Sequence, residues 1–268
     1  MKKIIAILLA TIMLVAICTG CTKTDEKKTL IVAMELAYPP FEMKDADGNA
    51  AGISADFSRA FAEFLGYDIR IDNIAWDGLI PSLQTGKADM VISSMTIRDD
   101  RKEQVDFSDP YANALLAILT NKNSGVTSVD DLNVAGKKLA LKTGTSAYFY
   151  AQANLPNAEI IALADESACV TEVSQGKADA FIYDQLTIYR NWQANLETTD
   201  AVFIPFQDVE KWGVAVQKGN TELLGKLNEF IKKYTEDGGF DELTEKHLAA
   251  EKKAFDDLGF RWFFDFSE

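Results

Sequence analysis

The sequence predicts an α/β protein made of two lobes, each with a mostly parallel sheet flanked by helices. Short apolar runs typical of strands alternate with segments whose apolar residues have helical spacing, which favours βαβ units and parallel pairing. This alternation occurs twice, over two stretches of similar length. The phrase GKAD marks the same point in both, at 86–89 and at 176–179, between a helical pattern and an apolar run.

The first stretch begins with TLIVAM, a run typical of a buried strand. In the helix predicted next, Phe57, Phe61 and Phe64 share one face, and Gly66 stands where the helix ends. In the following helix, Asp77 is the expected N-cap. The expected elements are a strand at 29–34, a hairpin at 44–53, a helix at 54–65, a strand at 67–74, a helix at 76–86 and a strand at 88–94.

The second stretch repeats this order and is followed by two more strands and a long helix. That last helix has apolar residues at helical spacing up to Gly238. The expected elements are a strand with a glycine-containing turn at 134–146, a helix at 147–155, a strand at 158–163, a helix at 166–176, strands at 178–184, 201–206 and 212–219, and a helix at 221–240.

The two GKAD phrases indicate equivalent positions rather than a chemistry of their own. Glycine is favoured just after a helix because it adopts the left-handed conformation without a Cβ clash. In open α/β sheets, ligands bind beyond the carboxyl ends of the strands. The residues after each GKAD strand, 93–96 in one lobe and 183–184 in the other, are therefore expected to face each other across a cleft.

The N-terminus has the pattern of a signal peptide. Lys2 and Lys3 precede an uncharged, mostly apolar run, and Gly20 is a small residue before Cys21. The run from 4 to 17 is short for a membrane span, which needs roughly 20 residues; an uncleaved anchor is the alternative. A cleavage site directly before a cysteine resembles a bacterial lipoprotein signal. We therefore predict a signal peptide at 1–20, lipidation at Cys21, a tether at 21–28, and an exported protein anchored on the extracytoplasmic face of the cell membrane.

The composition excludes several classes of partner. A net charge of −14 repels nucleic acid and anionic lipid. His247 is the single histidine, so a zinc site of the usual kind is not expected, and neither is another metal or cofactor. With Cys21 lipidated and the signal removed, Cys169 has no partner for a disulfide, and we interpret it as a small buried hydrophobe.

Five segments together resemble the bacterial extracellular solute-binding proteins of family 3, the polar amino-acid receptors of ABC importers. They are YPPFEM (38–43), the long block from WDGLIPSL to SDPY (76–111), LKTGTS (141–146), GKADAFIYDQ (176–185) and WGVAVQKG (212–219). The resemblance implies a two-lobed periplasmic-binding-protein-like fold of type 2. Lobe 1 would comprise 29–114 and 211–268, lobe 2 would comprise 115–210, and two hinge segments at 112–119 and 204–212 would join them.

The resemblance also implies the roles of the binding residues. Arg101 would hold the ligand α-carboxylate, helped by Thr96, Thr145 and Ser146. Asp184 would hold the α-ammonium together with Ser94. The ligand side chain would be enclosed by Tyr38 and Trp76, with Glu35, Ser93 and Lys142 in the same pocket. This chemistry is reasonable in itself, because a zwitterion removed from water needs both charges paired and hydrogen-bonded.

The expected function is therefore binding, not catalysis: a monomer that binds a polar amino acid in the cleft and delivers it to an ABC permease. An alternative is a dehydratase-like enzyme on the same fold, for which Glu35 and Lys142 are the candidate acid–base pair. A ligand-sensing module is a further alternative. The aromatic C-terminal tail is expected to pack onto lobe 1.

Overall fold

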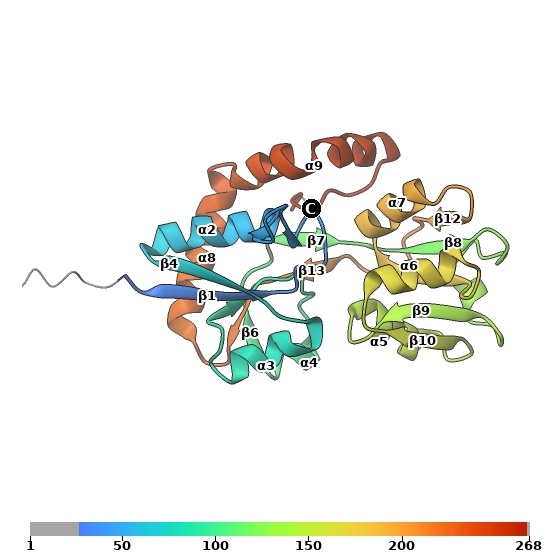
Figure 1. Cartoon of the computed structure of the whole chain (residues 1–268), viewed down its shortest axis with the longest axis horizontal. Helices are drawn as coiled ribbons and strands as arrows, with labels where there is room; N and C mark the ends of the chain where they lie inside the picture. The colour runs from blue at the N-terminus through green and yellow to red at the C-terminus, as the bar shows by residue number, and fades with distance from the viewer. Residues whose placement is uncertain (1–26, 267–268) are drawn as a thin grey trace, which may run out of the picture.

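The computed structural model describes residues 27–266 and has two separate five-stranded sheets, one in each lobe (Figure 1). In lobe 1 the strand order is β4-β1-β5-β14-β6. These strands are β1 (Thr29–Met34), β4 (Asp68–Asn73), β5 (Met90–Val91), β6 (Val105–Phe107) and β14 (Ala215–Gln217). One of these strands, β14, comes from a much later part of the chain than the other four.

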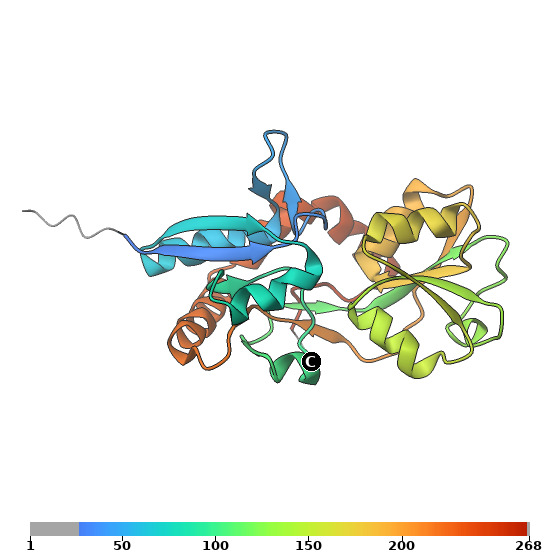
Figure 2. The ribbon, with the colours of Figure 1, turned by 60° about the horizontal axis from the view of Figure 1, so that its bottom comes forward.

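In lobe 2 the strand order is β10-β9-β11-β8-β12. The strands are β8 (Leu116–Asn121), β9 (Lys138–Lys142), β10 (Glu159–Leu163), β11 (Ala180–Asp184) and β12 (Thr199–Val202). All five come from one continuous stretch of chain. Figure 2 shows this lobe beside lobe 1, with connecting segments passing between them.

Parallel pairing is limited to three strands of each sheet. In lobe 1, β1 pairs parallel with β4 and β5, whereas β14 pairs antiparallel with β5 and β6. In lobe 2, β9 pairs parallel with β10 and β11, whereas β8 pairs antiparallel with β11 and β12. In each sheet four strands therefore run in the same direction and one is reversed, in agreement with the predicted mostly parallel sheets. The reversed strands β8 and β14 are those that follow a crossing between the lobes, so they enter their sheets from the opposite end.

Helices cover both faces of each sheet. In lobe 1, α3 (Leu79–Gln84) packs on one face, and α2 (Ile53–Leu65), α8 (Thr221–Glu236) and α9 (Gly239–Leu258) share a larger core on the other. In lobe 2, α5 (Ser146–Asn154) packs on one face. The other face is covered by α6 (Glu166–Ser174) and α7 (Gln185–Ala194). Other short elements are β2 (Met43–Lys44), β3 (Ala50–Ala51), α4 (Asp99–Lys102), and the 3-10 helices Trp76–Gly78 and Asp130–Leu132.

The aspartate of each GKAD phrase joins two parallel strands, a role that the sequence did not reveal. Asp89 Oδ2 accepts a hydrogen bond from the backbone N–H of Ile31 at 2.7 Å, and Asp179 Oδ2 accepts one from Lys138 N–H at 2.8 Å. The preceding glycines, Gly86 (φ 66°) and Gly176 (φ 71°), adopt the expected left-handed conformation. The phrase therefore ends a helix and fixes the register of the next strand in both lobes.

Two strands connect the lobes, and the C-terminal tail packs beside them. β7 (Ala112–Ala114) pairs antiparallel with β13 (Glu210–Trp212). Phe263 is fully buried in the lobe 1 core, and its carbonyl accepts a hydrogen bond from Asn113 N–H at 2.7 Å. The tail thus packs onto lobe 1 as predicted. It also contacts lobe 2, because the Gln185 side chain donates to the carbonyl of Arg261 at 2.8 Å.

Other details differ from the predictions or lie beyond the structure. Asp77 does not cap α3; it lies inside the 3-10 turn that precedes it, and Gly78 occupies the cap position. Cys169 is fully buried, as predicted. The signal peptide and Cys21 lie outside the described residues. Across residues 27–266, no helix combines the length and apolar character needed to cross a membrane. In the same range, no three His, Cys, Asp or Glu side chains are grouped so that they could hold a metal ion.

Candidate ligand-binding cleft

A cavity of about 500 Å³ lies between the lobes, and residues from both lobes line it. That volume includes space open to solvent at the mouth of the cleft. Every predicted ligand-binding residue except Lys142 lines it. The lining residues are Glu35, Tyr38, Trp76, Ser93, Ser94, Thr96, Arg101, Leu116, Thr145, Ser146, Tyr183, Asp184, Glu210 and Trp212.

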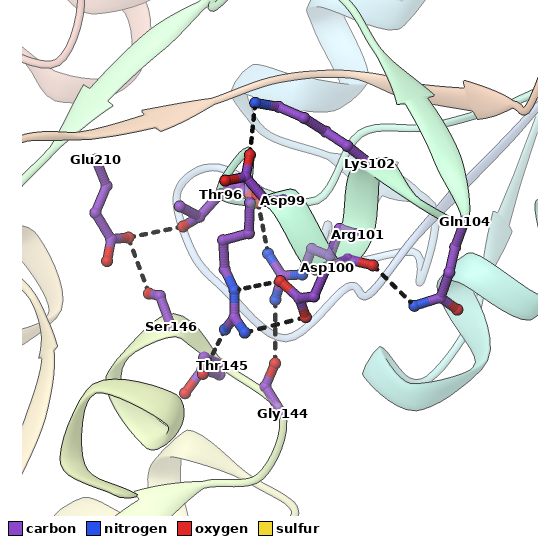
Figure 3. A network of polar contacts seen from close by, with 11 residues as sticks. Thr96, Asp99, Asp100, Arg101, Lys102, Gln104, Gly144, Thr145, Ser146 and Glu210 are labelled. Carbon is purple, nitrogen blue, oxygen red and sulfur yellow. Dashed lines mark hydrogen bonds and ion pairs between the residues drawn. The ribbon is translucent and has the colours of Figure 1, made fainter. Parts of the chain in front are cut away.

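Arg101 is a buried cation at the lobe 1 side of the cavity. It belongs to the single turn α4, and its side chain lies under Trp76, with the guanidinium 5.3 Å from the ring centroid. Nη1 donates to the Thr96 carbonyl at 2.7 Å, and Nη2 donates across the cleft to the Gly144 carbonyl at 3.0 Å (Figure 3). Burial lowers the pKa of Arg101 to about 10, so the group stays charged at neutral pH. A guanidinium has five N–H donors, so further donors remain for an anion.

Asp184 faces the same cavity from lobe 2. It ends β11 and caps α7, because Oδ1 accepts from the backbone N–H groups of Leu186 at 3.0 Å and Thr187 at 3.1 Å. Within the described part of the chain, Oδ2 and the Tyr38 hydroxyl are both buried without a hydrogen bond of ordinary geometry, although the two side chains lie close enough to interact with each other. Burial raises the pKa of the Asp184 carboxyl. A cation beside Oδ2 would satisfy this oxygen and favour the ionised form.

Glu35 and Lys142 form an ion pair across the cleft. Lys142 Nζ contacts Glu35 Oε2, and Glu35 Oε1 accepts from the backbone N–H of Trp76 at 3.2 Å. Lys142 Nζ also lies 5.6 Å from the centroid of a Trp76 ring. Lys142 therefore does not line the cavity itself, and it interacts with the site through its ion pair with Glu35.

Glu42, which the sequence did not single out, holds the loop after β5. It is fully buried, and it accepts hydrogen bonds from the hydroxyls of Ser54 and Ser94. Ser94 has the left-handed φ of 48°, which is uncommon for a residue with a Cβ. Burial raises the pKa of Glu42 to about 8. The Ser94 hydroxyl donates its proton to Glu42, so toward a ligand its oxygen can act only as an acceptor, which suits an α-ammonium.

Aromatic rings close the cavity on the side of Tyr38. Tyr38 stacks on Phe41 with centroids 5.5 Å apart, and meets Tyr183 and Trp212 edge-on at 6.1 Å. Tyr183 lines the cavity as expected, because residues 183–184 were predicted to face the cleft. Trp212 was not predicted to line the site, although it begins the segment WGVAVQKG. Leu116 had no such signal.

Three hydroxyls at the Arg101 end of the cavity have internal partners. Thr145 caps α5: its Oγ1 accepts from Tyr148 N–H at 3.3 Å and donates to the Lys142 carbonyl at 2.8 Å. The Thr96 and Ser146 hydroxyls both donate to one oxygen of Glu210, at 2.7 and 2.9 Å (Figure 3). Nothing in the sequence indicated Glu210, because it lies in a connecting segment without a regular pattern.

Comparisons with known proteins agree on one class. The chain matches the model of the bacterial extracellular solute-binding proteins, family 3, over residues 30–250. It is 31% identical to the L-cystine-binding protein TcyJ of Escherichia coli K12, over 85% of this chain and 86% of that one. It is 32% identical to a probable histidine-binding protein of Neisseria gonorrhoeae, over 94% and 97%. Among solved structures, an ancestral arginine-binding protein bound to glutamine is similar, with 34% identity, a TM-score of 0.75 and coverage of 83% and 98%.

Proposed function

Because the chain belongs to the bacterial extracellular solute-binding proteins of family 3, we propose that it binds a free amino acid between its lobes and delivers it to an ABC permease. One observation carries the proposal: Arg101 from lobe 1 and Asp184 from lobe 2 line the same cavity. A cation and an anion on opposite lobes match the α-carboxylate and α-ammonium of one amino acid. Binding energy is then available only when the lobes are together, which ties recognition to hinge closure.

The ion pair of Glu35 and Lys142 supports a polar ligand side chain. A side chain that approaches Glu35 meets a carboxylate whose charge is already balanced by Lys142. Such a pair accepts and donates hydrogen bonds but gives no net attraction to a simple cation. Amide, imidazole or zwitterionic side chains suit it. Histidine and cystine are named for two relatives, and arginine is named for others.

We further propose that the protein is exported, cleaved before Cys21, lipidated there, and monomeric. The N-terminal charge and hydropathy pattern supports export and the anchor. We also propose that lobe 1 comprises 29–114 and 211–268 and that lobe 2 comprises 115–210. The strands of the two sheets are consistent with this division. Mass spectrometry of the membrane fraction tests the anchor: an unmodified Cys21 contradicts it.

Calorimetric titration with each of the common amino acids and with cystine tests the binding function. We expect saturable heat with at least one amino acid, and recovery of that compound unchanged. Arg101→Ala should abolish the heat, whereas Arg70→Ala, which removes an exposed arginine paired with Asp72, should not. Retention of affinity within a few-fold in Arg101→Ala would contradict the assignment of the carboxylate site.

A dehydratase on this fold is the second candidate. One similar solved structure is an ancestral amino acid-binding protein described as a precursor of cyclohexadienyl dehydratase, with 37% identity and a TM-score of 0.75. Glu35 and Lys142 are the acid and base that such a reaction would require. We favour binding because the two groups are paired with each other. Formation of a dehydrated product during incubation with cyclohexadienyl acids would reverse this preference.

A further inference from the structure

Glu210 occupies a position in the cleft that its sequence surroundings did not predict. It is the first residue of β13, and the backbone beside it is fixed, because Ile97 N–H donates to the Lys211 carbonyl at 2.8 Å and Thr96 forms a β-bridge with Trp212. The connecting strand thus places Glu210 next to Thr96 of lobe 1. Ser146, at the start of α5 in lobe 2, approaches from the other side (Figure 3).

Both carboxylate oxygens of Glu210 are held. Oε2 accepts from the Thr96 hydroxyl at 2.7 Å and from the Ser146 hydroxyl at 2.9 Å. Oε1 accepts from the Gln207 amide at 2.8 Å. These contacts join a lobe 1 residue and a lobe 2 residue through one oxygen. The three side chains form a wall between the ligand cavity and an outer groove, since all of them line both.

A hydroxyl group has a single proton to donate. While Thr96 and Ser146 donate to Glu210, neither can donate to the carboxylate of a ligand. A ligand carboxylate at Arg101 would also lie close to the negative charge of Glu210. Two carboxylates therefore compete for the same two donors.

We propose that Glu210 is an internal competitor for the carboxylate-binding donors of the cleft, and that it sets how tightly the protein binds ligands carrying an α-carboxylate. The inference rests on the proposed function for its biological meaning. It predicts that the native cleft binds a free amino acid less tightly than its donors allow. It also predicts that the penalty disappears for ligands without that carboxylate.

The first test compares L-glutamine with its α-carboxamide, L-glutaminamide, by calorimetry on the wild type, Glu210→Ala and Asp208→Ala. Glutamine avoids a charged side chain, and Asp208→Ala removes a nearby acid from the outer groove. We expect Glu210→Ala to bind glutamine at least about tenfold more tightly, the equivalent of one charge-assisted hydrogen bond. Glutaminamide should change less than threefold, and Asp208→Ala should leave both affinities unchanged. An unchanged glutamine affinity, or an equal gain for glutaminamide, overturns the inference.

The second test needs no amino acid to bind, so it separates failure of this inference from failure of the proposed function. Glu210→Ala removes a carboxylate that acetate can replace. We expect acetate to raise the melting temperature of Glu210→Ala but not that of the wild type. The same rise should be absent from the triple variant Glu210→Ala, Thr96→Val, Ser146→Ala. Equal responses of Glu210→Ala and the triple variant mean that acetate acts elsewhere, and that Thr96 and Ser146 are not the contested donors.

Discussion

Replacing Asp184 by Asn should weaken ligand binding and at the same time stabilise the protein. Asn keeps an oxygen that can accept from the backbone N–H groups of Leu186 and Thr187, and it is as good an N-cap as Asp. The change therefore removes the charge but not the cap. Asp184→Ala removes both, so it serves as the comparison that isolates the cap.

The binding loss follows from the loss of a charge-assisted hydrogen bond to the ligand ammonium. Such a bond contributes about 1.5–3 kcal/mol, which is roughly 10- to 150-fold in Kd. The stability gain has a different origin. Burial raises the pKa of Asp184, so at neutral pH the ionised carboxylate costs free energy in the folded state that an amide does not. Asp184→Ala should instead lose about 1 kcal/mol of helix capping, and its melting temperature should be lower than that of Asp184→Asn.

Calorimetric titration at pH 7 gives the affinities, and differential scanning calorimetry without added amino acid gives the melting temperatures. The expected pattern is weaker binding in both variants but a higher melting temperature in Asp184→Asn only. Wild-type affinity in Asp184→Asn would refute the ammonium assignment. Weaker binding together with a lower melting temperature in Asp184→Asn would refute the view that its ionised form is unfavourable in the fold.

Two further predictions concern stability. Burial raises the pKa of Glu42 to about 8, so the folded protein keeps a proton that the unfolded chain releases above pH 4.5. The stability contributed by this proton should therefore fall as the pH rises from 4.5 to 8. Denaturant titrations at several pH values should show this decline in the wild type and a flatter one in Glu42→Gln. Asp89→Ala and Asp179→Ala each remove the acceptor of a strand N–H and should each cost about 1–3 kcal/mol. As controls, Lys87→Ala and Lys177→Ala in the same phrases should each cost under about 0.5 kcal/mol. Urea denaturation measures these losses, and equal losses for the aspartate and lysine variants would contradict the role given to the GKAD carboxylates.

Much of the fold was predictable because its signals are local. Apolar periodicity and helix-ending glycines located the helices and the strands around both GKAD phrases, and Gly86 and Gly176 have the expected left-handed backbone. Strand direction was less accessible, because β8 and β14 pair antiparallel as a result of long-range connections between the lobes. No local pattern contains that information.

The candidate site was predictable where a residue type and its neighbours indicate a role. Arg101 and Asp184 line one cavity, as the family resemblance implied, and Asp184 was also expected there because it ends a strand. The side-chain partners were not predictable. Glu42 and Glu210 come from a turn and a connecting segment, yet they accept the hydroxyl protons of Ser94, Thr96 and Ser146. Such pairings depend on which loops meet in space, and loops carry the weakest sequence signals.

The position of β14 in the lobe 1 sheet has a consequence for biosynthesis. β14 lies between β5 and β6, although Ala215–Gln217 follows every strand of lobe 2 in the chain. Lobe 2 is complete once Thr199–Val202 has emerged, whereas the lobe 1 sheet stays open until β14 arrives. Pairings over long sequence separations form slowly. Lobe 2 can therefore fold first and lobe 1 last. A chain truncated before β14 has an incomplete lobe 1 sheet and cannot form a closed cleft, even if all of its N-terminal half is present.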